Sequence, residues 1–433
     1  MEQSIKQRDR QVIWHPYTPM KVWPEAIAIT SGTGAYLTDE DGNRYLDAIS
    51  SWWVNLHGHS HPYIAEKVAE QLLTLEHCIF AGFTHEPAVR LAERLLEILP
   101  EGMSKIFYSD NGSTAVEVAI KMALQYWNNK GVKKKKLIAL ENAYHGDTFG
   151  AMAVSGRSIF TEAFTDFLFD VSFIPFPGAD NAQESIAALE ALLQQGDVAA
   201  MIAEPLIQGS AGMHMYSAAT LEQYFSLCRR YDTLIIADEV MTGFGRTGPL
   251  FACDHITTPP DIVCLSKGLT GGSMPLGVTA TTQRLFDAFY DDDRTRMLYH
   301  GHSFTANPTI CAAALASMDL LLMDSCTAAR QQIMNAHAAF AATVAGHPMI
   351  ADIRQTGTII ALTLRTDNPS YHDNIRDVIY RFFLEKKIIM RPLGNIIYIL
   401  PPYCITQEEL GYIYACIHEF LTIHGPQYIL NFH

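Results

Sequence analysis

The chain has 433 residues, of which 48% are hydrophobic and 18% are charged, a balance typical of globular rather than disordered proteins. A chain of this length is too long to fold around one compact core, so we predict a large domain with a smaller one. The formal net charge of −15 argues against nucleic acid as a main partner, because nucleic-acid-binding proteins need a basic surface. The eight cysteines are scattered singly and the N-terminus has no apolar leader, so we expect a cytoplasmic protein without a membrane span or a metal cluster.

The N-terminal part of the chain is rich in turns and leads into two helices. Short strands are predicted near residues 36–38 and 41–45, and helices over residues 62–78 and 87–99. Between the strands and the helices, the adjacent Trp52 and Trp53 are costly to expose to solvent. They are compatible with a place in the core or with the aromatic wall of a ligand pocket.

A strand, a glycine turn and a helix follow one another from residue 105 to residue 127. The helical pattern begins at Ala115, so the amides of Gly112 and Ser113 would open the helix. Free amides at the start of a helix bind anions, and the phosphate of a cofactor would fit there. A serine at this place is also typical of an ordinary helix cap.

The middle of the chain alternates apolar strands with helices. Strands are predicted over residues 137–141, 198–203, 233–237 and 262–265, and helices over residues 221–230 and 309–323. Tyr144 follows the first of these strands, where its ring could stack on a flat ligand or make a structural hydrogen bond.

Two polar residues, Asp238 and Lys267, stand at the ends of the last two of these strands. They lie 29 positions apart (267 minus 238), which leaves room for one crossover between parallel strands. Such strands place their carboxyl ends at one edge of the sheet, where α/β proteins bind ligands. A buried lysine has a lowered pKa and becomes a nucleophile. Either residue alone is more often a surface lysine or a helix-capping aspartate, whereas the pair favours a site for pyridoxal phosphate (PLP), which needs both groups.

The C-terminal part has the pattern of a small α+β domain. Strands are predicted over residues 357–364 and 396–400, and helices over residues 371–386 and 407–422. Arg391 follows a short strand, where its guanidinium could clamp a carboxylate or face solvent. We predict a large domain over residues 51–324, a small domain over residues 325–433, and an N-terminal segment over residues 1–50 that packs with the small domain.

Three motifs surround Asp238 and Lys267: Ile235-Ile-Ala-Asp-Glu-Val, Gly243-Phe-Gly-Arg-Thr-Gly and Ser266-Lys-Gly-Leu-Thr-Gly-Gly. Together they resemble the class III, or ω-, aminotransferases of PLP fold type I. The resemblance implies an α/β fold with a large, mostly parallel sheet domain and a smaller α+β domain. Further motifs are similar to the members of that family that aminate 8-amino-7-oxononanoate in biotin biosynthesis: Trp14-His-Pro-Tyr-Thr, Ser51-Trp-Trp, Asp110-Asn-Gly-Ser-Thr, Tyr144-His-Gly-Asp-Thr and Arg391-Pro-Leu-Gly.

The resemblance implies PLP as the cofactor and assigns residues to it. Lys267 would bond the cofactor covalently and, once released, carry the proton during the transfer. Asp238 would pair with the pyridine nitrogen, while Gly112 and Ser113 would hold the phosphate. Tyr144 would flank both the cofactor and the substrate.

The resemblance also assigns the residues that recognise the substrate. Trp52 would flank it, and Tyr17 and Arg391 would recognise the oxo acid, Arg391 through its carboxylate. Gly301, His302 and Ser303 would contribute to the phosphate and substrate site of the neighbouring subunit in a homodimer with shared active sites. The family more often has proline and threonine where this chain has His302 and Ser303.

The implied reaction is a ping-pong transamination with S-adenosylmethionine as amino donor, 8-amino-7-oxononanoate as acceptor and 7,8-diaminononanoate as product. The Trp52–Trp53 pair favours the bulky sulfonium donor, and lysine is the alternative donor. Another ω-aminotransferase, acting on a diamine, ornithine or a 4-aminobutyrate type of substrate, is the nearest alternative. A non-catalytic scaffold of the same fold is a further one, against which the intact Lys267 and Asp238 count.

Overall fold

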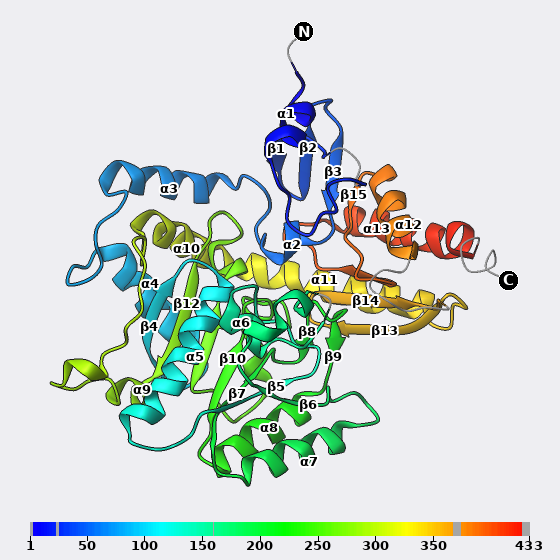
Figure 1. Ribbon diagram of the computed structural model, residues 1–433. Helices are drawn as coiled ribbons and strands as arrows, with labels where there is room; N and C mark the ends of the chain where they lie inside the picture. Colours follow the sequence, from blue (N-terminus) through cyan, green and yellow to red (C-terminus); the bar gives the residue numbers. More distant parts are fainter. Residues whose placement is uncertain (1–2, 23–25, 159, 367–373, 427–433) are drawn as a thin grey trace.

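The computed structural model describes residues 3–22, 26–158, 160–366 and 374–426 (Figure 1). Its largest sheet has seven strands in the order β4-β12-β11-β10-β7-β5-β6. These strands are β4 (Met103–Ser109), β5 (Lys136–Leu140), β6 (Ser172–Ile174), β7 (Val198–Ala203), β10 (Leu234–Asp238), β11 (Ile262–Leu265) and β12 (Gly277–Thr282). β12 runs antiparallel to both of its neighbours, and the other four pairs of strands are parallel. The prediction of a large, mostly parallel sheet is therefore confirmed.

Both faces of this sheet are covered, which explains why its strands are continuous apolar runs rather than alternating ones. In β10, Leu234 and Ile236 belong to the core on the side of α5 (Gly112–Asn129). Ile235 and Ala237 point to the opposite side and join the core that includes α7 (Ala182–Leu193) and α8 (Ala218–Arg230). Asp238 follows in the same alternation and therefore points toward the side of α5.

The remaining helices of the central part lie around the sheet. They are α3 (Pro62–Thr74), α4 (Glu86–Ile98), α6 (Phe149–Val154), α9 (Gln283–Asp287) and α10 (Pro308–Leu321). α10 packs against α3 and α4. Within the described residues no single helix is long and apolar enough to cross a membrane, and only α10 with α11 (Asp324–Val344), bent by 69°, passes that test of length and composition as a pair.

Two smaller sheets bring the two ends of the chain together. One has the order β13-β14-β16 and the other β1-β2-β3-β15, in which β15 runs parallel to β3 (Figure 1). Their strands are β1 (Ile29–Thr33), β2 (Tyr36–Asp39), β3 (Arg44–Asp47), β13 (Ile350–Thr356), β14 (Ile359–Leu364), β15 (Ile388–Ile389) and β16 (Ile396–Ile399). The helices of these regions are α1 (Ile5–Val12), α12 (Asn374–Glu385) and α13 (Gln407–Glu419), and a short hairpin joins β8 (Ile207–Gln208) to β9 (His214–Met215). The division into domains at residues 50 and 324 stays a prediction.

Several predicted boundaries were wrong. The helix predicted over residues 62–78 ends at Thr74, before the turn-rich stretch that leads to α4. The strand predicted over residues 357–364 begins at Ile359, because Gly357 has a φ of 55° and turns the chain between β13 and β14. The sequence prediction missed β13, and residues 371–373 of the helix predicted over 371–386 lie outside the described residues.

Candidate active site

The carboxyl ends of β10 and β11 meet at the edge of a cavity of about 690 Å³. The two strands are parallel neighbours, with Ile236 opposite Ile262 and Asp238 opposite Cys264. Asp238 ends β10, and Lys267 stands two positions past the end of β11; both line the cavity. The sheet therefore brings together the two residues whose spacing in the sequence predicted a shared edge.

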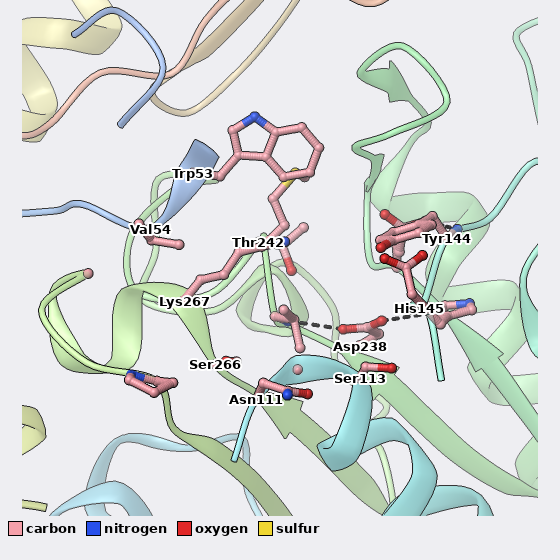
Figure 2. Close-up of a pocket in the computed structure, with 18 of the residues that line it drawn as sticks. Trp53, Val54, Asn111, Ser113, Tyr144, His145, Asp238, Thr242, Ser266 and Lys267 are labelled. Atoms are coloured by element: carbon pink, nitrogen blue, oxygen red, sulfur yellow. Dashed lines mark hydrogen bonds and ion pairs between the residues drawn. The ribbon is translucent and has the colours of Figure 1, made fainter. Parts of the chain in front are cut away.

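Lys267 lies on one side of this cavity, next to Trp53 (Figure 2). Its Nζ is 4.7 Å from the centroid of the Trp53 ring. The loss of water around this amine lowers the pKa of Lys267 below 10.5, although Asp238 and Glu204 attract its positive charge. A lysine in this surrounding has a larger fraction of the neutral, nucleophilic amine than a surface lysine has.

Asp238 is held in place by two hydrogen bonds on the floor of the cavity. Nδ1 of His145 lies 2.7 Å from Oδ2 of Asp238, and the backbone N–H of Val240 donates to Oδ1 at 3.1 Å (Figure 2). Asp238 is 4% exposed, so its carboxylate acts in a surrounding with little water. A carboxylate fixed in this way can face a positively charged group of a ligand without first reorganising.

The start of α5 forms the lower part of the cavity in Figure 2. Asn111 caps the helix, since its side chain accepts a hydrogen bond from the backbone N–H of Thr114 at 2.9 Å. A Cβ on Gly112 would lie 2.7 Å from Cγ1 of Val240, so glycine lets the helix start approach the strand ends closely. Ser113 Oγ accepts from the N–H of Thr148 at 3.0 Å. The first amides of α5 thus stand at a cavity, where they can bind an anion.

Tyr144 and Glu204 form the opposite wall. The backbone N–H of Tyr144 donates to Oε1 of Glu204 at 2.9 Å, and both residues line the cavity. Burial raises the pKa of the Tyr144 hydroxyl, and the nearby Asp147 carboxylate adds to this effect. Tyr144 is therefore neutral across the physiological range and can donate a hydrogen bond.

Trp52 and Trp53 lie in an unusual left-handed turn, in which Trp53 is buried and Trp52 is exposed. In α2 (Ser50–Trp53), four successive residues have φ between 45° and 73°, so this short segment is a left-handed turn. Non-glycine residues rarely adopt this conformation, which costs about 1–2 kcal/mol each. The turn is held by the Ser50 hydroxyl, which donates to the Leu400 carbonyl, and by Trp53 Nε1, which donates to the Tyr398 hydroxyl at 3.0 Å.

Trp52 forms a cluster with two further predicted substrate residues, Tyr17 and Arg391, beside the residues that line the cavity, and we call this cluster the rim. The ring centroids of Tyr17 and Trp52 are 5.7 Å apart, and Cζ of Arg391 lies 4.7 Å from the centroid of Trp52. Tyr17 also donates its hydroxyl hydrogen to Asp147 at 2.6 Å, which connects the rim to a residue that lines the cavity. The three residues come from segments far apart in the sequence, and the fold brings them together.

The segment Gly301-His302-Ser303 does not line this cavity within the described residues of the chain. Gly301 and Ser303 are exposed, and His302 Nδ1 lies 3.2 Å from Oδ1 of Asp110, just before α5. Its predicted contribution to the site of a second subunit stays a prediction.

The sequence prediction did not name His145 or Glu204 as site residues, and it left Trp53 open between the core and a pocket wall. The signal for Glu204 was present, because it follows β7 as Asp238 ends β10 and Lys267 follows β11. The carboxyl ends of neighbouring parallel strands share one edge of the sheet. His145 carried no such signal, since its contact with Asp238 depends on the turn after β5.

Comparisons with known proteins agree with this geometry. A family model described as aminotransferase class-III matches residues 17–421. The chain belongs to the class-III aminotransferases. A Synechococcus elongatus protein named adenosylmethionine-8-amino-7-oxononanoate aminotransferase is 49% identical over 417 residues, which cover 94% of this chain and 98% of the relative. A Geobacter sulfurreducens protein of the same name is 41% identical and covers 95% of this chain and 96% of its own length.

Two solved structures of aminotransferases share the fold. The crystal structure of adenosylmethionine-8-amino-7-oxononanoate aminotransferase from Methanocaldococcus jannaschii has a TM-score of 0.91 at 35% identity, covering 96% of this chain and 98% of that one. An ω-transaminase from Pseudomonas jessenii, solved in complex with PMP, has a TM-score of 0.93 at 27% identity and covers 100% of both chains. The chain is thus a PLP-dependent aminotransferase of fold type I.

The residues around the cavity fit PLP. The cofactor needs an anion site for its phosphate, a carboxylate for its pyridine nitrogen and a lysine for its aldehyde. The start of α5, Asp238 and Lys267 offer these three groups around one cavity. The low pKa of Lys267 and the hydrogen bonds that fix Asp238 suit the chemistry that each group has to perform.

Proposed function

We propose that this aminotransferase transfers the amino group of S-adenosylmethionine to 8-amino-7-oxononanoate and so forms 7,8-diaminononanoate for biotin biosynthesis. The name shared by the relatives from Synechococcus and Geobacter, which cover 94% and 95% of this chain, supports this assignment. The structural observation that carries it is the state of Arg391 at the rim.

Arg391 lies over the ring of Trp52, and no carboxylate pairs with it within residues 3–22, 26–158, 160–366 and 374–426. A planar guanidinium held next to an aromatic ring can offer two parallel N–H donors, which suits bidentate contact with a carboxylate. The acceptor 8-amino-7-oxononanoate has a carboxylate at the end remote from its reacting carbon. We assign this end to Arg391, with Tyr17 and Trp52 along the chain of the substrate.

The residues of the cavity floor would perform the chemistry. When bound, PLP supplies the electron sink for the transfer of the amino group. Asp238 would hold the ring nitrogen protonated, and the amides at Gly112 and Ser113 would hold the phosphate. The unprotonated amine of Lys267 would take a proton from the carbon that carries the amino group and return it on the other side of the transfer.

We assign the enzyme to a homodimer in which Gly301, His302 and Ser303 contribute to the partner's site. This segment is exposed and flanked by Tyr299 and Phe304, which are 58% and 60% exposed. Lys121 of α5 anchors it by donating to the Tyr299 carbonyl at 2.7 Å. Exposed aromatic residues on an anchored segment suit a protein interface. The eight free cysteines agree with a cytoplasmic location.

Mixed dimers test the shared site. Lys267→Ala and Ser303→Glu should each be inactive, the second because an acidic residue repels phosphate. If Ser303 acts across the interface, one of the two sites in a mixed dimer takes both intact residues, and activity returns. Mixed dimers that form by native mass spectrometry but stay inactive would show that Ser303 does not act on the partner's site.

The proposed function is tested by assay of the purified protein with 8-amino-7-oxononanoate and a panel of amino donors. We expect 7,8-diaminononanoate with S-adenosylmethionine and no product with lysine, ornithine, 4-aminobutyrate or diamines as donors. If the product forms only with lysine, lysine is the amino donor and S-adenosylmethionine is not. Conversion of ornithine, a diamine or 4-aminobutyrate without any conversion of 8-amino-7-oxononanoate would overturn the proposal.

A further inference from the structure

Glu204 is a buried carboxyl group that the proposed reaction does not use. It follows β7, is 6% exposed and lines the cavity. Its Oε1 accepts a hydrogen bond from the N–H of Tyr144 at 2.9 Å, and its Oε2 accepts one from the N–H of Gly209 at 2.9 Å. The backbone carbonyl of Glu204 accepts a hydrogen bond from the Tyr216 hydroxyl at 2.8 Å. One side chain thus joins the segment after β5 to the turn between β8 and β9.

The surroundings of Glu204 contain the charged groups of the site. Burial raises the pKa of Glu204 to about 7, the positive form of His145 acts against this rise, and Asp238 adds to it. Lys267 lines the same cavity, and the charge of Glu204 attracts its positive charge; Glu204 also acts on the nearby Tyr216 hydroxyl. In the part of the chain that the structure describes, His145 Nε2 is buried without a hydrogen-bond partner, while its Nδ1 faces Asp238.

Glu204 therefore affects the site in two ways, through its hydrogen bonds and through its charge. The backbone bond to Tyr144 fixes the start of the segment that carries both the Tyr144 ring and the His145 imidazole. A negative charge on Glu204 favours protonation of the amine of Lys267, whereas a neutral Glu204 does not. Since Glu204 titrates near neutral pH, its charge changes within the range in which the enzyme works.

We propose that Glu204 is a positioning residue of this aminotransferase, which holds the Tyr144–His145 segment against the cofactor site and sets the charge balance around Asp238 and Lys267. The inference rests on the proposed roles of Lys267 and Asp238, but not on the identity of the substrates. It differs from a purely structural role because it requires the charge of Glu204 to act on the cofactor site.

The test compares Glu204→Gln with Glu239→Gln in the holoenzyme. Glu239 is a matched control: it is fully buried, its pKa is also raised by burial to about 7, and it bonds to Thr242, Ala252 and Cys253 rather than lining the cavity. The two main readouts are the pH midpoint of the cofactor's visible absorbance and the midpoint of thermal unfolding, neither of which needs a substrate. KM for the acceptor is an additional readout for one variant.

We expect Glu204→Gln to move the absorbance midpoint to lower pH by about half a unit or more. The reason is that the variant lacks the negative charge that stabilises a proton held between Lys267 and the cofactor. Glu239→Gln should lower the unfolding temperature without moving the absorbance midpoint. Glu204→Asp keeps the charge but not the reach, so it should retain a midpoint near that of the wild type while KM for the acceptor rises through the misplaced Tyr144.

The proposal is overturned if Glu204→Gln titrates as the wild type does, or if Glu204→Gln and Glu239→Gln shift the midpoint equally. If Glu204→Gln does not fold, Glu204→Asp decides: a midpoint displaced in that variant, in spite of the retained carboxylate, refutes the role of charge. Failure of the proposed substrates in the assay of the wild type would leave the absorbance titration and its outcome unaffected.

Discussion

The floor and the rim of the cavity are built in different ways. We count as the floor Asp238 together with Lys267 and Glu204 on the walls beside it, because all three stand at the carboxyl ends of adjacent parallel strands, β10, β11 and β7. The rim residues come from separate segments: Tyr17 precedes β1, Trp52 lies in the left-handed turn α2, and Arg391 follows β15.

Exposure separates the two regions further. Asp238 is 4% exposed, whereas Trp52 and Tyr17 are 39% and 40% exposed. A sheet edge fixes its side chains through the ladder of backbone hydrogen bonds, and burial then tunes their pKa values. A rim assembled from remote loops can change its residues without disturbing that ladder. The floor therefore suits chemistry common to both half-reactions, and the rim suits the choice of substrate.

The largest expected effect lies in the floor. Asp238→Asn removes the negative charge while it keeps a group that His145 can bond, so the fold should survive. We expect both half-reactions to slow on the order of 10²–10³-fold, as when a fixed group that stabilises charge is removed from an active site. Single-turnover kinetics with donor alone and with acceptor alone measure the two rates. If only one half-reaction slows, the claim that the floor serves both half-reactions and the rim selects the substrate is wrong.

Arg391→Ala should separate the half-reactions. Loss of a bidentate partner of a carboxylate costs roughly 2–4 kcal/mol, or about 30- to 800-fold in binding. We expect this loss for 8-amino-7-oxononanoate and a much smaller one for the amino donor. Arg391→Lys is the control, since it keeps the charge without the planar fork and should recover only part of the affinity. Equal losses for both substrates would make Arg391 a structural residue.

Hydrophobic pattern and spacing alone, without the family resemblance, predicted the parts of the site that depend on strand ends. Asp238 and Lys267 could be paired in advance because two apolar runs with one crossover between them predict parallel neighbours. Trp53 could not be distinguished from Trp52, because the left-handed turn that separates their directions is unusual for non-glycine residues. The contact between His145 and Asp238 depends on a loop conformation that leaves no periodic pattern. Gly112 and Ser113 were predicted because an anion site needs only a helix start after a strand, and that helix start lies at the cavity.

His57 lies outside the floor and the rim, and its expected effect is on stability alone, with none on either half-reaction. Burial lowers the pKa of His57 to about 3, with further repulsion from His61, and its Nε2 lies 3.1 Å from the Ser317 hydroxyl. Below about pH 6.5 the unfolded chain therefore binds a proton at His57 that the folded protein does not bind. Its contribution to the free energy of unfolding falls by about 1.4 kcal/mol per unit as the pH drops from 6.5 toward 3.

Replacement of this histidine, His57→Asn, should remove that part of the acid sensitivity. Urea unfolding between pH 4 and pH 6.5 measures the slope in both proteins. Glu204 and Glu239 contribute in the opposite direction, because their raised pKa values of about 7 reduce stability as the pH rises from 4.5 toward 7. Both proteins share this contribution, so it cancels when the slope of the variant is subtracted from that of the wild type. Identical slopes would show that the buried imidazole is not the group that titrates.

The claim that the chemistry of this aminotransferase is located at the ends of β10 and β11 is tested most directly by trapping the cofactor. Borohydride reduction of the holoenzyme, followed by proteolysis and peptide mass spectrometry, should find the cofactor on Lys267. Lys267→Ala should still bind PLP through the phosphate site and Asp238, but it should have no turnover and no trapped cofactor. Covalent label on any other lysine, or turnover retained in Lys267→Ala, would contradict the account.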